Sequence, residues 1–134
     1  MSYKYLLDTN IISDLVRHPQ GLVFQRLAAV EETCICTSII VVCELRFGAA
    51  KSGSLRLLQQ LESILELLPI VSLSPPVDQH YAVIRTHLEQ IGKPIGPNDL
   101  LIAAHALVLN LTLVTANVRE FGRVPGLRVE NWLL

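Results

Sequence analysis

The chain has 134 residues and a formal net charge of −1 at pH 7, which excludes a nucleic-acid binder that relies on overall basic charge. Its length fits a single domain, residues 1–134, with a substantial hydrophobic core. Apolar residues make up 51% and charged residues only 17%, against typical values of ~45–50% and ~25%, so we expect exposed apolar surface for a partner or for self-association.

Short strands and helices are predicted to alternate along the chain. Apolar runs bounded by turn residues predict strands at 3–7, 33–37, 70–73, 111–115 and 127–129. Helical periodicity and capping residues predict helices at 11–17, 22–30, 39 to about 51 behind Ser38, 55–68, 76 to about 91, and 100–109. This alternation predicts an α/β domain with three layers, in which helices flank a central, mainly parallel sheet of about five strands.

Residues 100–118 contain no charged side chain, which is also a property of membrane spans. We instead expect a helix and a strand joined at Asn110, a residue that suits a helix cap. The N-terminus enters a strand without a signal-peptide pattern. Cys34, Cys36 and Cys43 are odd in number and lack metal-binding spacing, so we expect buried free thiols. These features predict a cytoplasmic protein with no membrane segment.

Three carboxylates, those of Asp8, Glu44 and Asp99, lie in apolar surroundings far apart in the sequence. Asp8 directly follows the first strand, and open α/β sheets bind ligands at that carboxyl edge. Glu44 lies in an apolar helix beside residues such as Val41 and Phe47, although glutamate is rarely buried without a partner. Asp99 begins another apolar helix. Together, without His or Cys partners, the three acids predict an oxygen-lined site for a hard cation, Mg²⁺ or Mn²⁺.

Each acid also has a structural explanation. Asp8 could cap the following helix, and Asp99 could complement a helix dipole. Glu44 could pair with Arg85, or with Arg46 of another chain. Considered residue by residue, these alternatives stay open.

The fourth strand is followed by two more polar candidates. Asn117 comes directly after it and is therefore expected at the same edge of the sheet, where its amide could orient water or a carboxylate. Glu120 lies one helical turn further and could add charge. Both residues could equally belong to a polar turn.

Four short motifs follow one another along nearly the whole chain. They are Leu6-Leu7-Asp8-Thr9-Asn10, Glu44 followed by Leu45 and Gly48, Pro97-Asn98-Asp99 with Ile102-Ala103-Ala104, and Thr115-Ala116-Asn117-Val118-Arg119-Glu120-Phe121. Each motif alone is weak, but all four in this order resemble the PIN-domain ribonucleases, and among them the VapC toxins of bacterial toxin–antitoxin pairs. The ending Gly126-Leu127-Arg128-Val129-Glu130-Asn131-Trp132 extends the likeness.

The resemblance implies a PIN-like fold and a Mg²⁺- or Mn²⁺-dependent endoribonuclease. It implies metal-site roles for Asp8, Glu44 and Asp99, with Asn117 as a fourth catalytic position where the family often has Asp. It further implies a VapB-like antitoxin that blocks the site, a homodimer, and a structured RNA substrate such as transfer RNA.

Other side chains could support such a site. Candidates for hydrogen bonds to the acids or to a phosphate are Thr9, Asn10, Ser38, Thr115 and Glu120. Candidates for a basic phosphate path are Arg17, Arg46, Lys51, Lys93 and Arg119. Among the histidines, we expect His80 and His87 to be exposed and His105 to be a hydrogen-bonded core residue.

Two other functions are considered. A phosphatase with Asp8 as nucleophile would usually need a second acid two residues on, where this chain has Asn10. A catalytically weak or inactive PIN-like binding module is the alternative to the nuclease, and the presence of all three acids argues against it.

Overall fold

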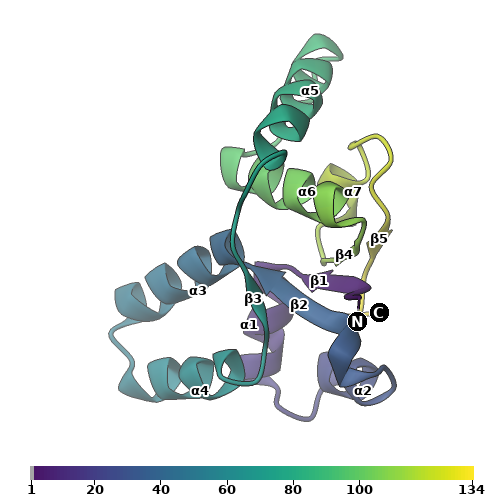
Figure 1. Cartoon of the computed structure of the whole chain (residues 1–134). Coiled ribbons are helices and arrows are strands. Elements are labelled where there is room, and N and C mark those ends of the chain that lie inside the picture. Colours follow the sequence, from purple (N-terminus) through teal and green to yellow (C-terminus); the bar gives the residue numbers. More distant parts are fainter. Residues whose placement is uncertain (1) are drawn as a thin grey trace.

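Within residues 2–134, which the computed structural model describes, a five-stranded parallel sheet runs through the middle of the protein (Figure 1). In spatial order the strands are β3 (Ile70–Val71), β2 (Ile35–Ser38), β1 (Tyr5–Leu7), β4 (Thr112–Val114) and β5 (Val129–Glu130). Every neighbouring pair is parallel. The predicted α/β sheet is therefore confirmed, although each strand is shorter than its predicted range.

Helices connect the strands and cover both faces of the sheet. They are α1 (Thr9–Arg17), α2 (Leu22–Ala28), α3 (Ile39–Ser52), α4 (Leu55–Leu65), α5 (Val77–Gln90), α6 (Pro97–Leu109) and α7 (Val118–Phe121). In Figure 1, α6 lies above the strands and α1 and α2 lie below them. Helix α5 packs on α6 and extends away from the sheet, while α3 and α4 pack with α1. The predicted three-layer arrangement is confirmed.

Several element boundaries differ from the predicted ones. Helix α1 begins at Thr9 because the Asp8 carbonyl already accepts hydrogen bonds from Ile11 and Ile12. A 3₁₀ turn, Glu32–Cys34, occupies the start of the predicted second strand. The charge-free stretch folds as α6 and β4, and Asn110 caps α6 in the left-handed conformation, with φ of 56°, as predicted. No helix in the described part of the chain is long and apolar enough to span a membrane.

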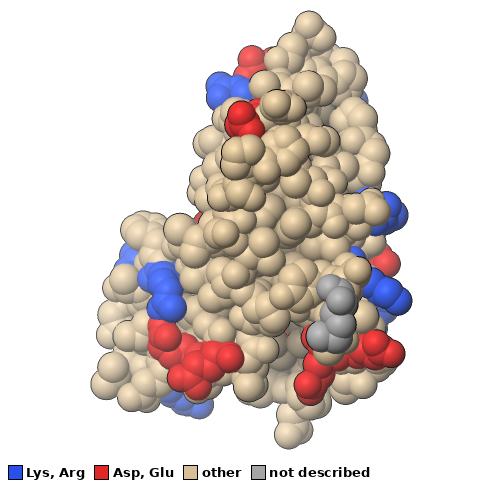
Figure 2. Space-filling model, viewed as in Figure 1, with Lys and Arg blue, Asp and Glu red and all other residues tan. Residues whose placement is uncertain are grey.

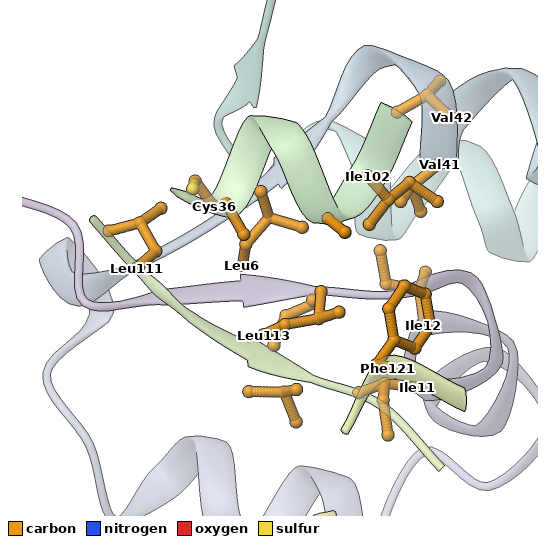
Figure 3. Close-up of a cluster of buried hydrophobic side chains, with 14 of the residues drawn as sticks. Leu6, Ile11, Ile12, Cys36, Val41, Val42, Ile102, Leu111, Leu113 and Phe121 are labelled. Atoms are coloured by element: carbon orange, nitrogen blue, oxygen red, sulfur yellow. The ribbon is translucent and has the colours of Figure 1, made fainter. Parts of the chain in front are cut away.

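The core joins the sheet to the helices on both faces. Leu6 of β1 and Cys36 of β2 are register partners, both fully buried, and project towards Ile102 of α6 (Figure 3). Ile11 and Ile12 of α1 pack near Phe121 of α7 at the other end of β1. These contacts fix the start of α1 and the segment after β4 at the same edge of the sheet.

The strand order reverses between β1 and β4. The chain runs from β1 to β2 and β3 in one direction, then crosses to β4 and β5 on the opposite side of β1. The carboxyl ends of strands on either side of such a switch form the usual ligand crevice of an open α/β sheet. Asp8 lies at this point, and its backbone N–H donates to the Val114 carbonyl across 2.9 Å.

The surface has the exposed apolar side chains expected from the low charged fraction. Val83, Phe47 and Leu55 are 70%, 68% and 67% exposed. Figure 2 shows a face on which charged side chains lie at the margins and the centre is uncharged. Cys34 and Cys36 are buried free thiols as predicted, whereas Cys43 is exposed, because it lies on the outer face of α3.

Candidate active site

A polar pocket of about 490 Å³ lies at the switch point, at the carboxyl edge of the sheet. It is lined by Asp8, Thr9, Asn10, Ser13, Asp14, Arg17, His18, Glu44, Asp99, Asn117 and Leu133. These residues come from α1, α3, α6, the segments after β1 and β4, and the C-terminal end. The structure thus brings together the three predicted acids and Asn117, which are far apart in the sequence.

Asp8 is only 4% exposed, and its carboxylate is held by hydrogen bonds from two side chains. Its Oδ2 accepts from the Thr115 hydroxyl at 2.8 Å and from the Asn10 amide at 3.4 Å. Asp8 occupies the N-cap position of α1, but its side chain makes no capping hydrogen bond. Burial, and to a smaller extent the charge of Glu44, raises the pKa of Asp8. Helix capping therefore does not account for this buried carboxylate.

Glu44 faces the pocket from α3, where its Oε1 accepts a hydrogen bond from the Thr9 hydroxyl. The two arginines considered as its partners are engaged within this chain: Arg46 pairs with Glu62, and Arg85 pairs with Glu89. Within residues 2–134, Glu44 has no ion pair. Its carboxylate is therefore available to a cation in the pocket.

Asp99 enters the pocket from the first turn of α6. Burial raises the pKa of its carboxyl to about 6, and the charges of Asp8, Glu44 and Glu120 contribute further. The N-cap position of this helix belongs to Gly96. Glu120 is close enough to influence Asp99, although it does not line the pocket. The site therefore concentrates negative charge that a bound cation would compensate.

Asn117 reaches the same pocket from the segment after β4. Its backbone N–H donates to the Thr115 hydroxyl at 3.0 Å, and the neighbouring Ala116 N–H donates to Asn10 Oδ1 at 2.9 Å. The bond from Ala116 ties the segment to α1. Within the described residues, the Asn117 side chain makes no capping hydrogen bond to α7. A helix-capping side chain therefore does not account for the position of Asn117 at the pocket.

The comparisons with known proteins agree with this geometry. The sequence matches the PIN domain family over residues 5–127. The chain belongs to the PIN-domain family. Ribonuclease VapC2 of Rickettsia felis is 42% identical over 130 residues, covering 96% of this chain and 97% of that protein. The tRNA(fMet)-specific endonuclease VapC of Shigella flexneri is 35% identical over 130 residues, covering 96% and 98%.

A solved structure also shares the arrangement of this PIN domain. It is VapBC2 from Rickettsia felis bound to a DNA fragment from its promoter, with a TM-score of 0.87 and 38% identity. The match covers 96% of this chain and 98% of that chain. The predicted resemblance to the PIN-domain ribonucleases and to VapC proteins is confirmed.

The donor set of this PIN domain suits one kind of metal site. No three His, Cys, Asp or Glu side chains within residues 2–134 are already arranged to hold an ion. Mg²⁺ is usually bound by one or two carboxylates and keeps several waters. Asp8, Glu44 and Asp99 offer only hard oxygen atoms around a shared space. They fit a water-rich Mg²⁺ or Mn²⁺ site and do not fit a closed cage of protein ligands.

Ser38 is a candidate that the structure does not bring to the pocket. Its buried hydroxyl accepts from the Ile40 N–H at 3.2 Å, as the N-cap of α3, and lies 2.8 Å from Nδ1 of His105. His105 is therefore the hydrogen-bonded core residue that was predicted, and burial lowers its pKa. His80 and His87 are exposed on α5, also as predicted.

Four pocket residues were missed in the sequence: Ser13, Asp14, His18 and Leu133. A signal existed for the first two, because residues 10, 13, 14 and 17 share one face of a helix. Leu133 carries no such signal, since it reaches the pocket through the packing of the C-terminal segment.

Proposed function

We propose that this protein is the toxin of a type II toxin–antitoxin pair and a Mg²⁺- or Mn²⁺-dependent endoribonuclease that hydrolyses RNA phosphodiesters in the cytoplasm. The observation that carries the proposal is the convergence of Asp8, Glu44 and Asp99 on one pocket at the switch point of the sheet. The relatives named Ribonuclease VapC2 and tRNA(fMet)-specific endonuclease VapC support the same reaction class.

The three acids, Asn117 and two threonines have separate roles in this proposal. Asp8, Glu44 and Asp99 would hold the ion, which when bound supplies charge neutralisation at the phosphate and lowers the pKa of water at the site. Thr115 orients Asp8, and Thr9 orients Glu44. Asn117 would hydrogen-bond water or a phosphate oxygen without adding charge.

The proposed partner is a VapB-like antitoxin that covers the pocket. The solved Rickettsia felis neighbour is a VapBC2 assembly bound to DNA, and this chain covers 98% of the matched chain. Exposed apolar side chains such as Phe47 and Leu55 supply surface for the antitoxin and for a second copy of the chain in a homodimer. A structured RNA such as transfer RNA is the proposed substrate class.

Mapping of new RNA ends tests the proposal. Purified protein is incubated with total cellular RNA in Mg²⁺ and, separately, in chelator. We expect defined cleavage sites that require the divalent ion and disappear in Asp99→Asn. A catalytically inactive binding module would retain RNA without new ends, and a phosphatase would release phosphate from small esters; either result would refute the nuclease.

A further inference from the structure

The pocket presents an electrostatic problem for a polyanionic substrate. Its walls carry the carboxylates of Asp8, Asp14, Glu44 and Asp99, and Arg17 is the only lysine or arginine among the described residues that line it. An RNA backbone that approaches this pocket meets mostly negative charge until a metal ion is bound. A fixed cation at the rim would offset part of that repulsion.

Arg17 has the position and the freedom to be that cation. It is the last residue of α1 and is exposed, on the helix face that also carries Asn10, Ser13 and Asp14. Within residues 2–134, Arg17 forms no ion pair, although Asp14 lies one turn away. Its guanidinium is therefore not committed to another residue of the described chain.

The remaining basic residues of the predicted phosphate path are placed differently. Arg46 is paired with Glu62, on the exposed side of α3 and α4. Lys51, Lys93 and Arg119 do not line the pocket. Arg17 also lines an adjoining groove of about 260 Å³, which shares Thr9, Ser13 and Glu44 with the pocket. Arg17 therefore lies between the groove and the pocket, where it could contact an RNA strand that extends from one into the other.

We propose that Arg17 binds a phosphate of the RNA backbone next to the one that is hydrolysed, and so positions the strand over Asp8, Glu44 and Asp99. The planar guanidinium can donate two parallel hydrogen bonds to phosphate oxygens, which a lysine cannot match. This inference rests on the proposed endoribonuclease function and names one of its substrate contacts. A purely structural role also exists for Arg17, because a cation in the last turn stabilises the helix dipole.

Kinetics and salt dependence distinguish the two roles. Arg17→Ala and Arg17→Lys are compared with wild type and with Arg85→Ala, whose arginine is paired with Glu89 on α5 and lies outside the pocket. A defined RNA cleaved by the wild type serves as substrate in Mg²⁺. RNA binding is measured separately on the Asp99→Asn protein, with and without Arg17→Ala, at salt concentrations on both sides of ~0.1 M, where the Debye length is about 10 Å.

We expect Arg17→Ala to raise KM about 10-fold with kcat within about twofold, because the contact is made equally in the ground and transition states. Arg17→Lys should recover part of the loss. The slope of the logarithm of the binding constant against the logarithm of the salt concentration is negative, and it should become less negative by ~0.7, the value for one phosphate contact on a single strand. Arg85→Ala should change none of these quantities.

Two results would overturn the inference. One is that Arg17→Ala matches Arg85→Ala in KM and in salt slope. The other is a lower melting temperature with an unchanged salt slope, which would assign Arg17 to the helix end alone. If the wild type neither cleaves nor binds RNA, the proposed endoribonuclease function is wrong, and the Arg17 contact is wrong as well. The measurements on the wild type identify this outcome separately from a failure of the Arg17 inference alone.

Discussion

The hydroxyl of Thr115, directly after β4, donates a 2.8 Å hydrogen bond to Oδ2 of Asp8, directly after β1. Both residues are buried, and the bond crosses the point where the strand order reverses. Thr115 also accepts from the backbone N–H of Asn117 at 3.0 Å. One hydroxyl therefore couples the orientation of the most buried acid to the segment that carries Asn117.

Thr115→Val should weaken metal binding by ~10–100-fold, the usual loss for an outer-shell partner, because Asp8 loses the donor that orients it. It should also lower the free energy of unfolding by about 1 kcal/mol. The matched control is Thr37→Val, which removes a buried 2.7 Å hydrogen bond to the Leu7 carbonyl one residue before Asp8. Calorimetric titration with Mn²⁺ checks the result, and equal affinity in both variants would reduce Thr115 to a structural role.

Asp99 should make the stability of the metal-free protein depend on pH. Its pKa is about 6 in the folded state against an ordinary value of 3.8, so the folded state binds more protons than the unfolded state between these values. Its contribution to stability is therefore fully present below the lower value and is lost as pH rises through the upper one. Asp99→Asn removes this loss.

Melting curves in chelator from pH 4 to 8 test the effect of Asp99→Asn. The variant should become more stable than wild type as pH passes 6, by about 1 kcal/mol or a few degrees, since the half-buried carboxyl is partly screened by solvent. Saturating Mg²⁺ should reverse the order, because only the wild type gains full binding energy. A stability difference between Asp99→Asn and wild type that does not vary with pH would refute the interpretation that burial and the neighbouring carboxylates raise the pKa of Asp99.

Asn117→Asp should tighten Mg²⁺ binding and leave cleavage possible, since a carboxylate is a better ligand for a hard cation than an amide. Without metal, the variant should be less stable than wild type, because a further like charge enters the pocket. Asn110→Asp makes the same charge change beyond the opposite end of β4 and should leave metal affinity unchanged. Calorimetry and melting in chelator provide the two measurements. No change in either for Asn117→Asp would remove this residue from the site.

Ser38→Ala should destabilise the protein without impairing cleavage. The substitution removes the N-cap of α3 and the partner of buried His105, a combined cost of about 2 kcal/mol. Ser54→Ala removes only the N-cap of α4 and should cost about 1 kcal/mol. Denaturant unfolding measures both, and the difference gives the contribution of the His105 contact. A large loss of cleavage by a folded Ser38→Ala protein would show that Ser38 contributes to the active site after all.

The sequence was sufficient to predict where the main acids meet, because parallel strands present their carboxyl ends at one edge. Asp8 and Asn117 each follow a strand, so their proximity depends only on topology. Glu44 and Asp99 were recognised by the contrast between their charge and their apolar neighbours. Ser38 shows the limit of this reasoning, because it ends β2 at the same edge of the sheet but its hydroxyl caps α3 and contacts buried His105.

Other features depended on tertiary packing that the sequence pattern does not encode. Five cations were candidates for the phosphate path, and the structure places only Arg17 of these five on the pocket wall, on the helix face that it shares with Asn10. Phe47 was expected beside Glu44 on the same face of α3, where Val41 is fully buried, but Phe47 itself is 68% exposed. Leu133 reaches the pocket because the neighbouring Trp132 is buried against Tyr5, with ring centroids 5.1 Å apart.

The central claim is that Asp8, Glu44 and Asp99 act together in metal-dependent RNA cleavage. Its most direct test is single-turnover cleavage of a defined RNA in Mg²⁺ by Asp8→Asn, Glu44→Gln and Asp99→Asn, with Asp78→Asn as an exposed control outside the pocket. Each pocket variant should lose more than ~100-fold in rate, beyond the usual effect of an outer-shell residue, while melting no lower than wild type in chelator. Wild-type cleavage by any one of the three would contradict the claim.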